Sequence, residues 1–470
     1  MSGENRARHN FTKWPKALAC CFAFSLFCVG VSGSPAQNTP QGSARLERAS
    51  RSIQAGDLAK AEQELQSVLA ADPRQAEALS LLGVVRMRQH RDSEAESLLR
   101  RAVQSNPRLT DAHINLGYLY KQQGQTARAL ENFEKAKELL PQDPEVLFNL
   151  ALLHADQKNF KTAISELLNI PATRRPGNYW EILSRLYATD GNFGKAEESL
   201  QKVLESRPDS VSALRRLAGM AMKRGDSRQA WEYLARARSL APNSPELLYD
   251  FARVSLQNNL SREAVLAMRK AILLEPEDPD YLMFLGNSLL NTPDFHDALP
   301  LFKKYVEMRR EDADGHLSLG WTLFLEKDWK EAQNELEQSL RLNPNQGAPY
   351  YHLGMIAYET GNNDLALENF GRALKQQPNE AKAHYGMGLV YSRENRYEPA
   401  QQEFETASRL DPDEPKYHYQ LSQIYARQGD TSRASHEQEL YQEAQKRSEE
   451  KINSGQAMPY SASGARRRGT

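Results

Sequence analysis

Apolar residues recur along this 470-residue chain in two helical patterns that alternate with each other. In the first pattern, which we call helix A, apolar residues stand at positions 4, 7, 8 and 11 of a 34-residue stretch. In the second, helix B, they stand at positions 20, 24 and 27, as in Ala129, Phe133 and Ala136. Because spacings of three and four residues place side chains on one helical face, each stretch predicts a helical hairpin.

The hairpin is repeated along almost the whole chain. Its position-20 alanine recurs at steps of 34 residues, with one step of 33, at Ala61, Ala95, Ala129, Ala163, Ala196, Ala230, Ala264, Ala298, Ala332, Ala366, Ala400 and Ala434. If each repeat begins nineteen residues before its alanine, twelve repeats fill residues 42–448. A single hairpin cannot bury its apolar face but stacked neighbours can, so the pattern predicts an all-α stack of about twelve hairpins.

Two further sets of residues, each at a fixed position of the repeat, indicate how the two helices of a hairpin pack and connect. Position 8 is glycine, alanine or serine in every repeat, as at Gly117 and Gly354, which lets helices A and B approach closely. The turn between them often contains a residue suited to the left-handed conformation that ends a helix: Gly56, Gly124, Gly191, Gly225, Asn259, Gly361, Asn395 and Gly429. Most repeats end in proline, which suits the turn before a new helix.

These features resemble the tetratricopeptide repeat family. Its pattern W-x2-L-G-x2-Y is matched by residues 180–187, with Ser184 in place of glycine, and in part by Leu116–Tyr120. The resemblance covers 407 of the 470 residues and implies an α-solenoid, a right-handed superhelix with the A helices on its concave wall. The first and last repeats depart from the pattern with polar residues at core positions, as expected of caps.

The N-terminus has the form of an export signal. Arg6, Arg8, Lys13 and Lys16 precede the 15-residue apolar run ALACCFAFSLFCVGV (17–31). This run is short for a membrane span, so we predict a signal peptide over residues 1–33, cleaved near 33–36, in an exported bacterial-type protein. The alternative is an uncleaved inner-membrane anchor. Residues 34–41 are predicted to be a linker, and residues 449–470 a disordered, basic-ended tail.

Composition and motifs argue against catalysis and cofactors. The 61 acidic and 60 basic residues nearly balance, so no global field attracts nucleic acid. All three cysteines lie in the first thirty residues, and no phosphate loop, H-E-x-x-H or G-x-S-x-G motif is present. Four histidines, His113, His316, His384 and His418, occupy position 4 of helix A, one per repeat, which favours packing over metal binding. We therefore expect no enzyme, no cofactor and no metal.

The family resemblance places a partner-binding stripe at positions 2, 5, 9 and 12 of the A helices, where two zones stand out. The basic zone, which could bind carboxylates or pair with neighbouring acids, contains Arg185, Arg215, Arg216, Lys223 and Arg253. The aromatic zone, which could form a groove or pack between repeats, contains Tyr249, Met283, Leu317, Trp321, Phe324, Tyr351, Met355, Tyr358, Tyr385 and Tyr419.

These observations favour a non-catalytic, exported scaffold, periplasmic or secreted, that binds a protein or peptide partner through its concave groove. The alternative is an accessory subunit of an envelope machine for polysaccharide export, pilus assembly or outer-membrane assembly, tethered to the membrane if the N-terminal segment is retained. An enzyme such as a repeat-bearing glycosyltransferase needs a further catalytic domain, and about sixty residues lie outside the repeats. Membrane contact is expected only through the N-terminal segment.

Overall fold

Paired α-helices make up the computed structural model, which describes residues 40–290 and 295–453. Within these residues, 24 α-helices follow one another without a strand. The predicted signal peptide lies outside the described residues, as do all but the last two residues of the predicted linker and all but the first five of the predicted tail. The all-α fold of about twelve hairpins is confirmed.

The chain divides into two compact units, the first ending at Pro208 and the second beginning at Asp209. The helices of the first unit are α2 (Pro40–Gln54), α3 (Leu58–Ala71), α4 (Ala76–Arg88), α5 (Asp92–Ser105), α6 (Thr110–Gln122), α7 (Thr126–Leu139), α8 (Pro144–Asp156), α9 (Phe160–Leu168), the 3₁₀ turn η2 (Ala172–Arg174), α10 (Tyr179–Thr189) and α11 (Phe193–Ser206).

The helices of the second unit are α12 (Val211–Arg224), α13 (Ser227–Leu240), α14 (Pro245–Gln257), α15 (Ser261–Leu274), α16 (Pro279–Leu289), the 3₁₀ turn η3 (Phe295–Asp297), α17 (Ala298–Met308), α18 (Ala313–Leu325), α19 (Trp329–Leu342), α20 (Gly347–Glu359), α21 (Asn363–Gln376), α22 (Ala381–Arg393), α23 (Tyr397–Leu410), α24 (Pro415–Arg427) and α25 (Thr431–Asn453).

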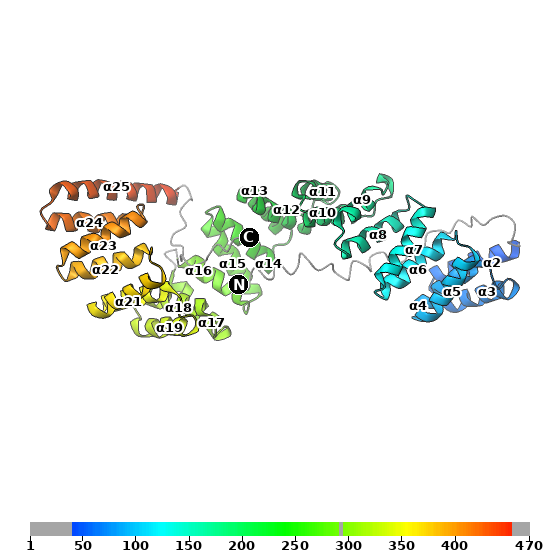
Figure 1. The fold of residues 1–470 in the computed structure, drawn as a ribbon, viewed down its shortest axis with the longest axis horizontal. Helices are drawn as coiled ribbons and strands as arrows, with labels where there is room; N and C mark the ends of the chain where they lie inside the picture. Colours follow the sequence, from blue (N-terminus) through cyan, green and yellow to red (C-terminus); the bar gives the residue numbers. More distant parts are fainter. Residues whose placement is uncertain (1–39, 291–294, 454–470) are drawn as a thin grey trace. The chain divides into compact units, whose positions relative to one another are not determined.

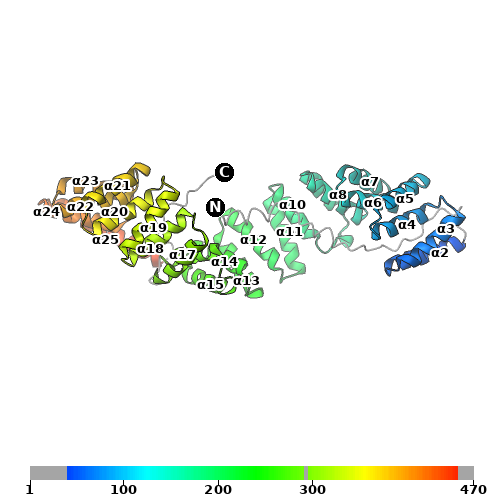
Figure 2. The same ribbon diagram turned by 90° about the horizontal axis from the view of Figure 1, so that it is seen from below.

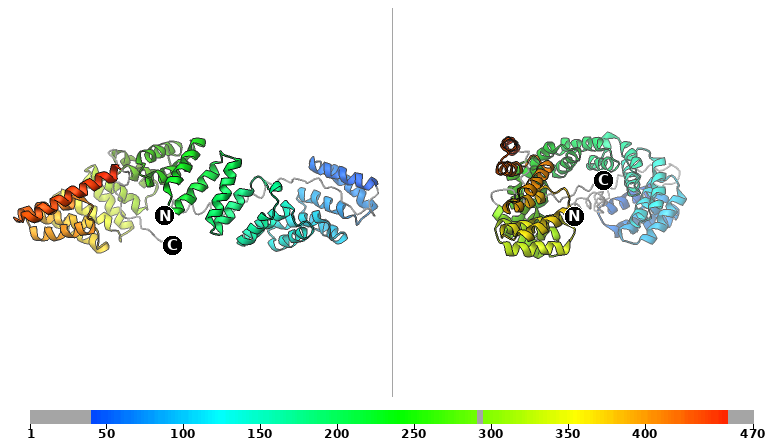
Figure 3. Two further views of the ribbon diagram at one scale, coloured as in Figure 1. Left: turned by 90° about the horizontal axis from the view of Figure 1, so that it is seen from above. Right: turned by 60° about the vertical axis from the view of Figure 1, so that its left-hand side comes forward.

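Within each unit, every even-numbered helix packs against the odd-numbered helix that follows it, and each hairpin packs against the next (Figure 1). The same pairing can be followed in Figure 2 and Figure 3. Even-numbered helices are the predicted A helices, and they also contact one another between adjacent hairpins, as α18 contacts α20 and α20 contacts α22. None of the described helices has both the length and the apolar character needed to cross a bilayer.

The small residue at position 8 brings the two helices of a hairpin together, as predicted. A Cβ atom added to Gly117 would lie 2.7 Å from the ring of Phe133, and one added to Gly354 would lie 2.6 Å from the ring of Phe370. Both rings are fully buried. Glycine at position 8 therefore leaves the space that a large position-24 side chain fills.

The turn residue at position 15 has positive φ in every repeat where it is described. The predicted glycines and asparagines adopt this conformation, with φ between 58° and 86°. His90, Lys158 and Lys327 adopt it as well, which the sequence did not indicate. The tight A–B connection therefore sets the backbone conformation whatever residue stands there.

A lysine in this conformation is strained, so we expect Lys327→Gly to stabilise the second unit by about 0.5–1 kcal/mol. Lys327 is exposed, with φ of 62°, so removing its side chain costs little packing. Thermal unfolding checks this result. Gly225→Ala, at φ of 86°, serves as the opposite change and should lower the melting temperature. A lower melting temperature for Lys327→Gly would contradict the argument.

The repeat is irregular at α9, at α17, which has 11 residues, and at both ends of the array. Helix α9 has 9 residues where most B helices have 14, and η2 follows it. Pro171 stands directly before η2, and proline cannot continue a helix interior, which explains the early end and the single 33-residue step. At the array's ends, α2 begins at Pro40, inside the predicted linker, and α25 continues to Asn453, past residue 448.

Candidate partner-binding surface

The most prominent feature of the predicted stripe is a group of aromatic rings around Trp321, in the second unit. The ring of Trp321 stacks on that of Phe324 with centroids 5.1 Å apart and planes 12° apart. His352, on the next A helix, lies 4.2 Å from Trp321, and Trp329, on α19, lies 5.2 Å from Phe324. We call these four residues the Trp321 cluster. Trp321 and Phe324 are half-buried, so each ring keeps an accessible edge.

His352 adds an uncharged, buried ring to this cluster. Its side chain is buried, and burial, with a smaller effect of Lys382, lowers its pKa to about 3. The imidazole is therefore neutral at physiological pH. An uncharged ring packed against Trp321 favours an apolar contact surface, because no buried charge has to be desolvated when a partner binds.

Other members of the aromatic zone belong to contacts between helices. Tyr351 is only 8% exposed, and its ring centroid lies 6.1 Å from that of Phe370. Met355 and Tyr358 pack against the same core, and Tyr385 lies between Phe404, at 5.7 Å, and Tyr417, at 5.2 Å. Tyr351 therefore fills the space between repeats, while Met355, Tyr358 and Tyr385 are half-buried, as Trp321 and Phe324 are.

The ends of the aromatic zone differ from its middle. Tyr249 packs against Tyr281 at 5.4 Å and Phe284 at 5.2 Å and is half-buried, as are Met283 and Leu317. Tyr419 is 44% exposed and lies 5.8 Å from Tyr441. The predicted zone is therefore a series of separate aromatic groups along the A helices of the second unit.

The residues of the basic zone are divided between the two units. Arg185 belongs to the first unit, where burial lowers its pKa. In the second unit, Arg215 donates to Asp250 Oδ2 from Nε at 3.0 Å and from Nη2 at 2.5 Å. Arg253 lies 5.9 Å from the ring of Tyr249, while Arg216 is half-buried and Lys223 is exposed. Arg215 therefore pairs with a neighbouring acid, Asp250, which was one of the two expectations for this zone.

The stripe of the first unit contains a polar network that the sequence did not single out. Tyr118 Oη donates to Glu145 Oε1 at 2.6 Å and accepts from Asn149 Nδ2 at 2.9 Å. Lys121 Nζ donates to Asn149 Oδ1 at 2.9 Å. Burial raises the pKa of Glu145 and lowers that of Lys121. The residues stand at positions 9 and 12 of one repeat and 2 and 6 of the next, a spacing that could have revealed them.

The position-4 histidines are packed as predicted, and each also makes two hydrogen-bond contacts. Nδ1 lies beside the position-23 residue of helix B, which is Asn132 for His113 and a glutamate for the other three. Nε2 lies beside the carbonyl oxygen six residues earlier in the chain. These histidines are one per repeat and form no shared metal site.

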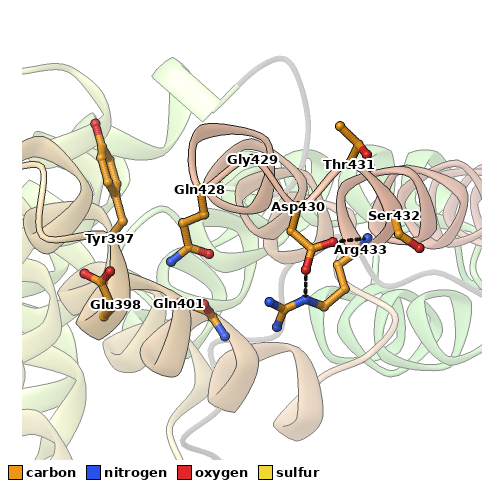
Figure 4. Close-up of a pocket in the computed structure, with 9 residues that line it drawn as sticks. All are labelled: Tyr397, Glu398, Gln401, Gln428, Gly429, Asp430, Thr431, Ser432 and Arg433. Atoms are coloured by element: carbon orange, nitrogen blue, oxygen red, sulfur yellow. Dashed lines mark hydrogen bonds and ion pairs between the residues drawn. The ribbon is translucent and has the colours of Figure 1, made fainter.

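A hollow of about 710 Å³ lies between α23 and the start of α25 (Figure 4). Asp430 accepts hydrogen bonds there from the backbone N of Arg433 at 2.9 Å and from its Nε at 2.6 Å. The other residues that line it are Tyr397, Glu398, Gln401, Gln428, Gly429, Thr431 and Ser432. Asp430 therefore uses both of its carboxylate oxygens on Arg433.

Comparison with known families agrees with this architecture. A model described as the tetratricopeptide repeat matches residues 52–116, 120–186, 221–287 and 357–424. A second model with the same description matches residues 183–245, 287–347 and 317–381. The first model covers more than half of the chain, so the chain belongs to the tetratricopeptide repeat family. Proteins of this family are interaction scaffolds that bind protein partners and are generally non-catalytic.

Solved structures with a similar arrangement are distant in sequence. Yeast Tom70 is 17% identical, with 81% of this chain and 94% of that chain covered and a TM-score of 0.40. A tetratricopeptide repeat protein from Parabacteroides merdae is 18% identical, with 53% and 100% covered and a TM-score of 0.35. None of these similarities carries an argument about function. No curated protein sequence matches the chain.

Proposed function

We propose that this chain is a non-catalytic, exported scaffold that binds a protein partner along the A helices of its second unit. The observation that carries the proposal is the Trp321 cluster, which presents two half-buried rings over a neutral histidine. Tryptophan and tyrosine are enriched among the residues that dominate binding energy at protein interfaces. The expected partner segment is a helix or an extended peptide with at least one large apolar side chain.

The first unit is a less suitable place for such a segment. Its stripe around Tyr118 is occupied by hydrogen bonds among its own side chains, and a partner would have to replace them. At the Trp321 cluster, by contrast, Trp321 packs against two uncharged rings, those of Phe324 and His352. Binding there costs less desolvation of charge.

The test is site-specific photo-crosslinking from the full-length chain in its native compartment. With a photoreactive phenylalanine at position 324, we expect one partner to be crosslinked, and with the same group at position 273 we expect none. Leu273 is 82% exposed on helix α15, a B helix, so it samples solvent without lying on the stripe. Equal crosslinking from both positions would mean that the aromatic zone is not the site.

The purified partner then allows an affinity measurement. Trp321→Ala should weaken its binding at least tenfold, about 1.4 kcal/mol or more, because a large anchor is removed. Leu273→Ser is the matched control and should leave the affinity unchanged, although it also removes an exposed apolar side chain. Both variants must keep the wild-type melting temperature within about 2 °C, roughly 1 kcal/mol.

Export is the second part of the proposal, supported by the basic residues and the apolar run of the N-terminal 33 residues. Intact-mass measurement of the mature protein from a bacterial host tests it, with cleavage near residues 33–36 expected. A retained segment in the membrane fraction would instead favour the tethered accessory subunit of an envelope machine. Full-length protein in the cytoplasm would contradict both forms.

A further inference from the structure

Three consecutive helices of the first unit bring Glu134, His154 and Glu166 together. They come from α7, α8 and α9, and one carboxylate oxygen from each glutamate and one ring nitrogen of the histidine all lie within 4.8 Å of one another. His154 Nε2 is 3.8 Å from Glu134 Oε1. In tetrahedral zinc sites, ligands about 2.0–2.1 Å from the metal lie roughly 3.3 Å apart, so these atoms would fill three of the four positions after closing by up to about 1.5 Å.

Three polar atoms at this place lack hydrogen-bond partners. Both ring nitrogens of His154 and Oε2 of Glu166 are buried without one, and Glu166 as a whole is only 5% exposed. Its other oxygen, Oε1, accepts from Lys137 Nζ at 2.6 Å. A buried lone pair without a partner is unfavourable, and a bound cation would satisfy it.

The chemistry of these atoms points to a cation. Two carboxylates and Lys137 give a formal charge of about −1 beside the imidazole of His154. The imidazole nitrogen and carboxylate oxygens all offer lone pairs, which is the donor set of a divalent transition metal. We infer that Glu134, His154 and Glu166 form a binding site for a divalent transition-metal ion, with Zn²⁺ as the best fit.

Two features limit the affinity of this site. His154 Nδ1 has no partner to orient the ring, and the loss of such an outer contact typically weakens metal binding about 10–100-fold. Lys137 also lies 3.8 Å from Glu134 Oε2, so it holds a positive charge beside the metal position. The dissociation constant for zinc is therefore expected to lie in the micromolar range. The positive charge of Lys137 contributes to this weak affinity.

The experiment titrates zinc sulfate into the full-length, chelator-treated protein by calorimetry and follows its melting temperature. We expect one zinc per chain and a higher melting temperature. His154→Ala should abolish this binding. Glu166→Gln should also abolish it, and because glutamine keeps the shape of glutamate, this variant serves as the test if His154→Ala is unstable. Lys137→Gln removes the charge but keeps a donor for Glu166, and should tighten binding about tenfold.

His296→Ala is the matched control, because His296 Nδ1 also lies beside a glutamate, Glu326, at 2.5 Å, but on the exposed surface of the second unit. Zinc binding in this variant should equal that of the wild type. No stoichiometric binding in either the wild type or Lys137→Gln would overturn the site, and so would zinc binding that survives His154→Ala.

Discussion

Replacing Gly354 with alanine is expected to destabilise the second unit by about 1–3 kcal/mol, although alanine is normally the better helix former. The reason is Phe370, whose fully buried ring lies between two glycines. A Cβ on Gly354 would come within 2.6 Å of it, and a Cβ on Gly386, in the next repeat, within 2.5 Å. The ring cannot move away from one glycine without approaching the other, so the clash has to be relieved by separating helices.

Gly371→Ala is the control for this prediction. Gly371 lies in α21, the same helix as Phe370, and a Cβ there would meet nothing within 4 Å. The substitution should therefore stabilise the protein by about 0.5–1 kcal/mol through helix propensity alone. Urea unfolding of both variants measures the two effects. A stabilised Gly354→Ala variant would show that Phe370 can repack and that the close approach is not required.

Raising the pH from 6 to 9 is expected to weaken the last two repeats. His384 Nδ1 lies 2.6 Å from Glu403 and His418 Nδ1 lies 2.7 Å from Glu437, while their Nε2 atoms face the carbonyl oxygens of Pro378 and Pro412. A carbonyl and an ionised carboxylate only accept, so each ring donates from both nitrogens when it is protonated.

These contacts determine the sign of the pH effect. The hydrogen bond to glutamate raises the pKa of both histidines, against smaller opposing effects of burial and of Arg409 or Arg447. A raised folded-state pKa means that the stabilisation is complete below the unfolded value of about 6.5 and is lost as the pH rises through the folded value. Hydrogen bonds to charged groups contribute about 1.5–3 kcal/mol each, so the loss should be measurable by thermal unfolding.

Two variants isolate these pairs from other titrating groups. Glu403→Gln combined with Glu437→Gln should reduce the difference in melting temperature between pH 6 and pH 9. In the first unit, His113 faces the neutral Asn132 in the same geometry, with Nδ1 and Oδ1 3.4 Å apart. Asn132→Glu should therefore introduce a new loss of stability at high pH. An unchanged pH profile in both variants would exclude the pairs as its source.

Much of the fold could be predicted because the residue pattern of each repeat indicates its helices, its close helix contact and its turn. Apolar spacing located the helices, Gly354 and its equivalents located the close contacts, and Gly225 and Asn259 located the left-handed turns. Lys327 could not be predicted, because nothing in a lysine indicates positive φ and the tight turn imposes it. The division after Pro208 was also not indicated, since the repeat continues in register across it.

The candidate sites were harder to predict because they depend on which side chains end up buried. Trp321 and Tyr351 look alike as large aromatic residues on A helices, yet Trp321 is half-buried on the stripe and Tyr351 fills the core. The partners of Glu134 come from two other helices with no motif spacing. His154 stands at position 11, which is normally apolar, and this was the one sequence signal that could have drawn attention to it.

The two kinds of contact described above act differently on a linear array. Phe370 touches glycines of two successive repeats and so couples neighbours, whereas each histidine–glutamate pair lies inside one repeat, and only the histidine Nε2 reaches the turn that ends the repeat before it. In a one-dimensional array of this type, weakening a terminal repeat makes the end fray while the interior stays folded. His418 and Glu437 belong to the last repeat, so alkaline conditions should first lower the protection of amides against hydrogen exchange in α24 and α25, measured relative to the intrinsic exchange rate at the same pH, and leave the protection in α20 and α21 unaltered.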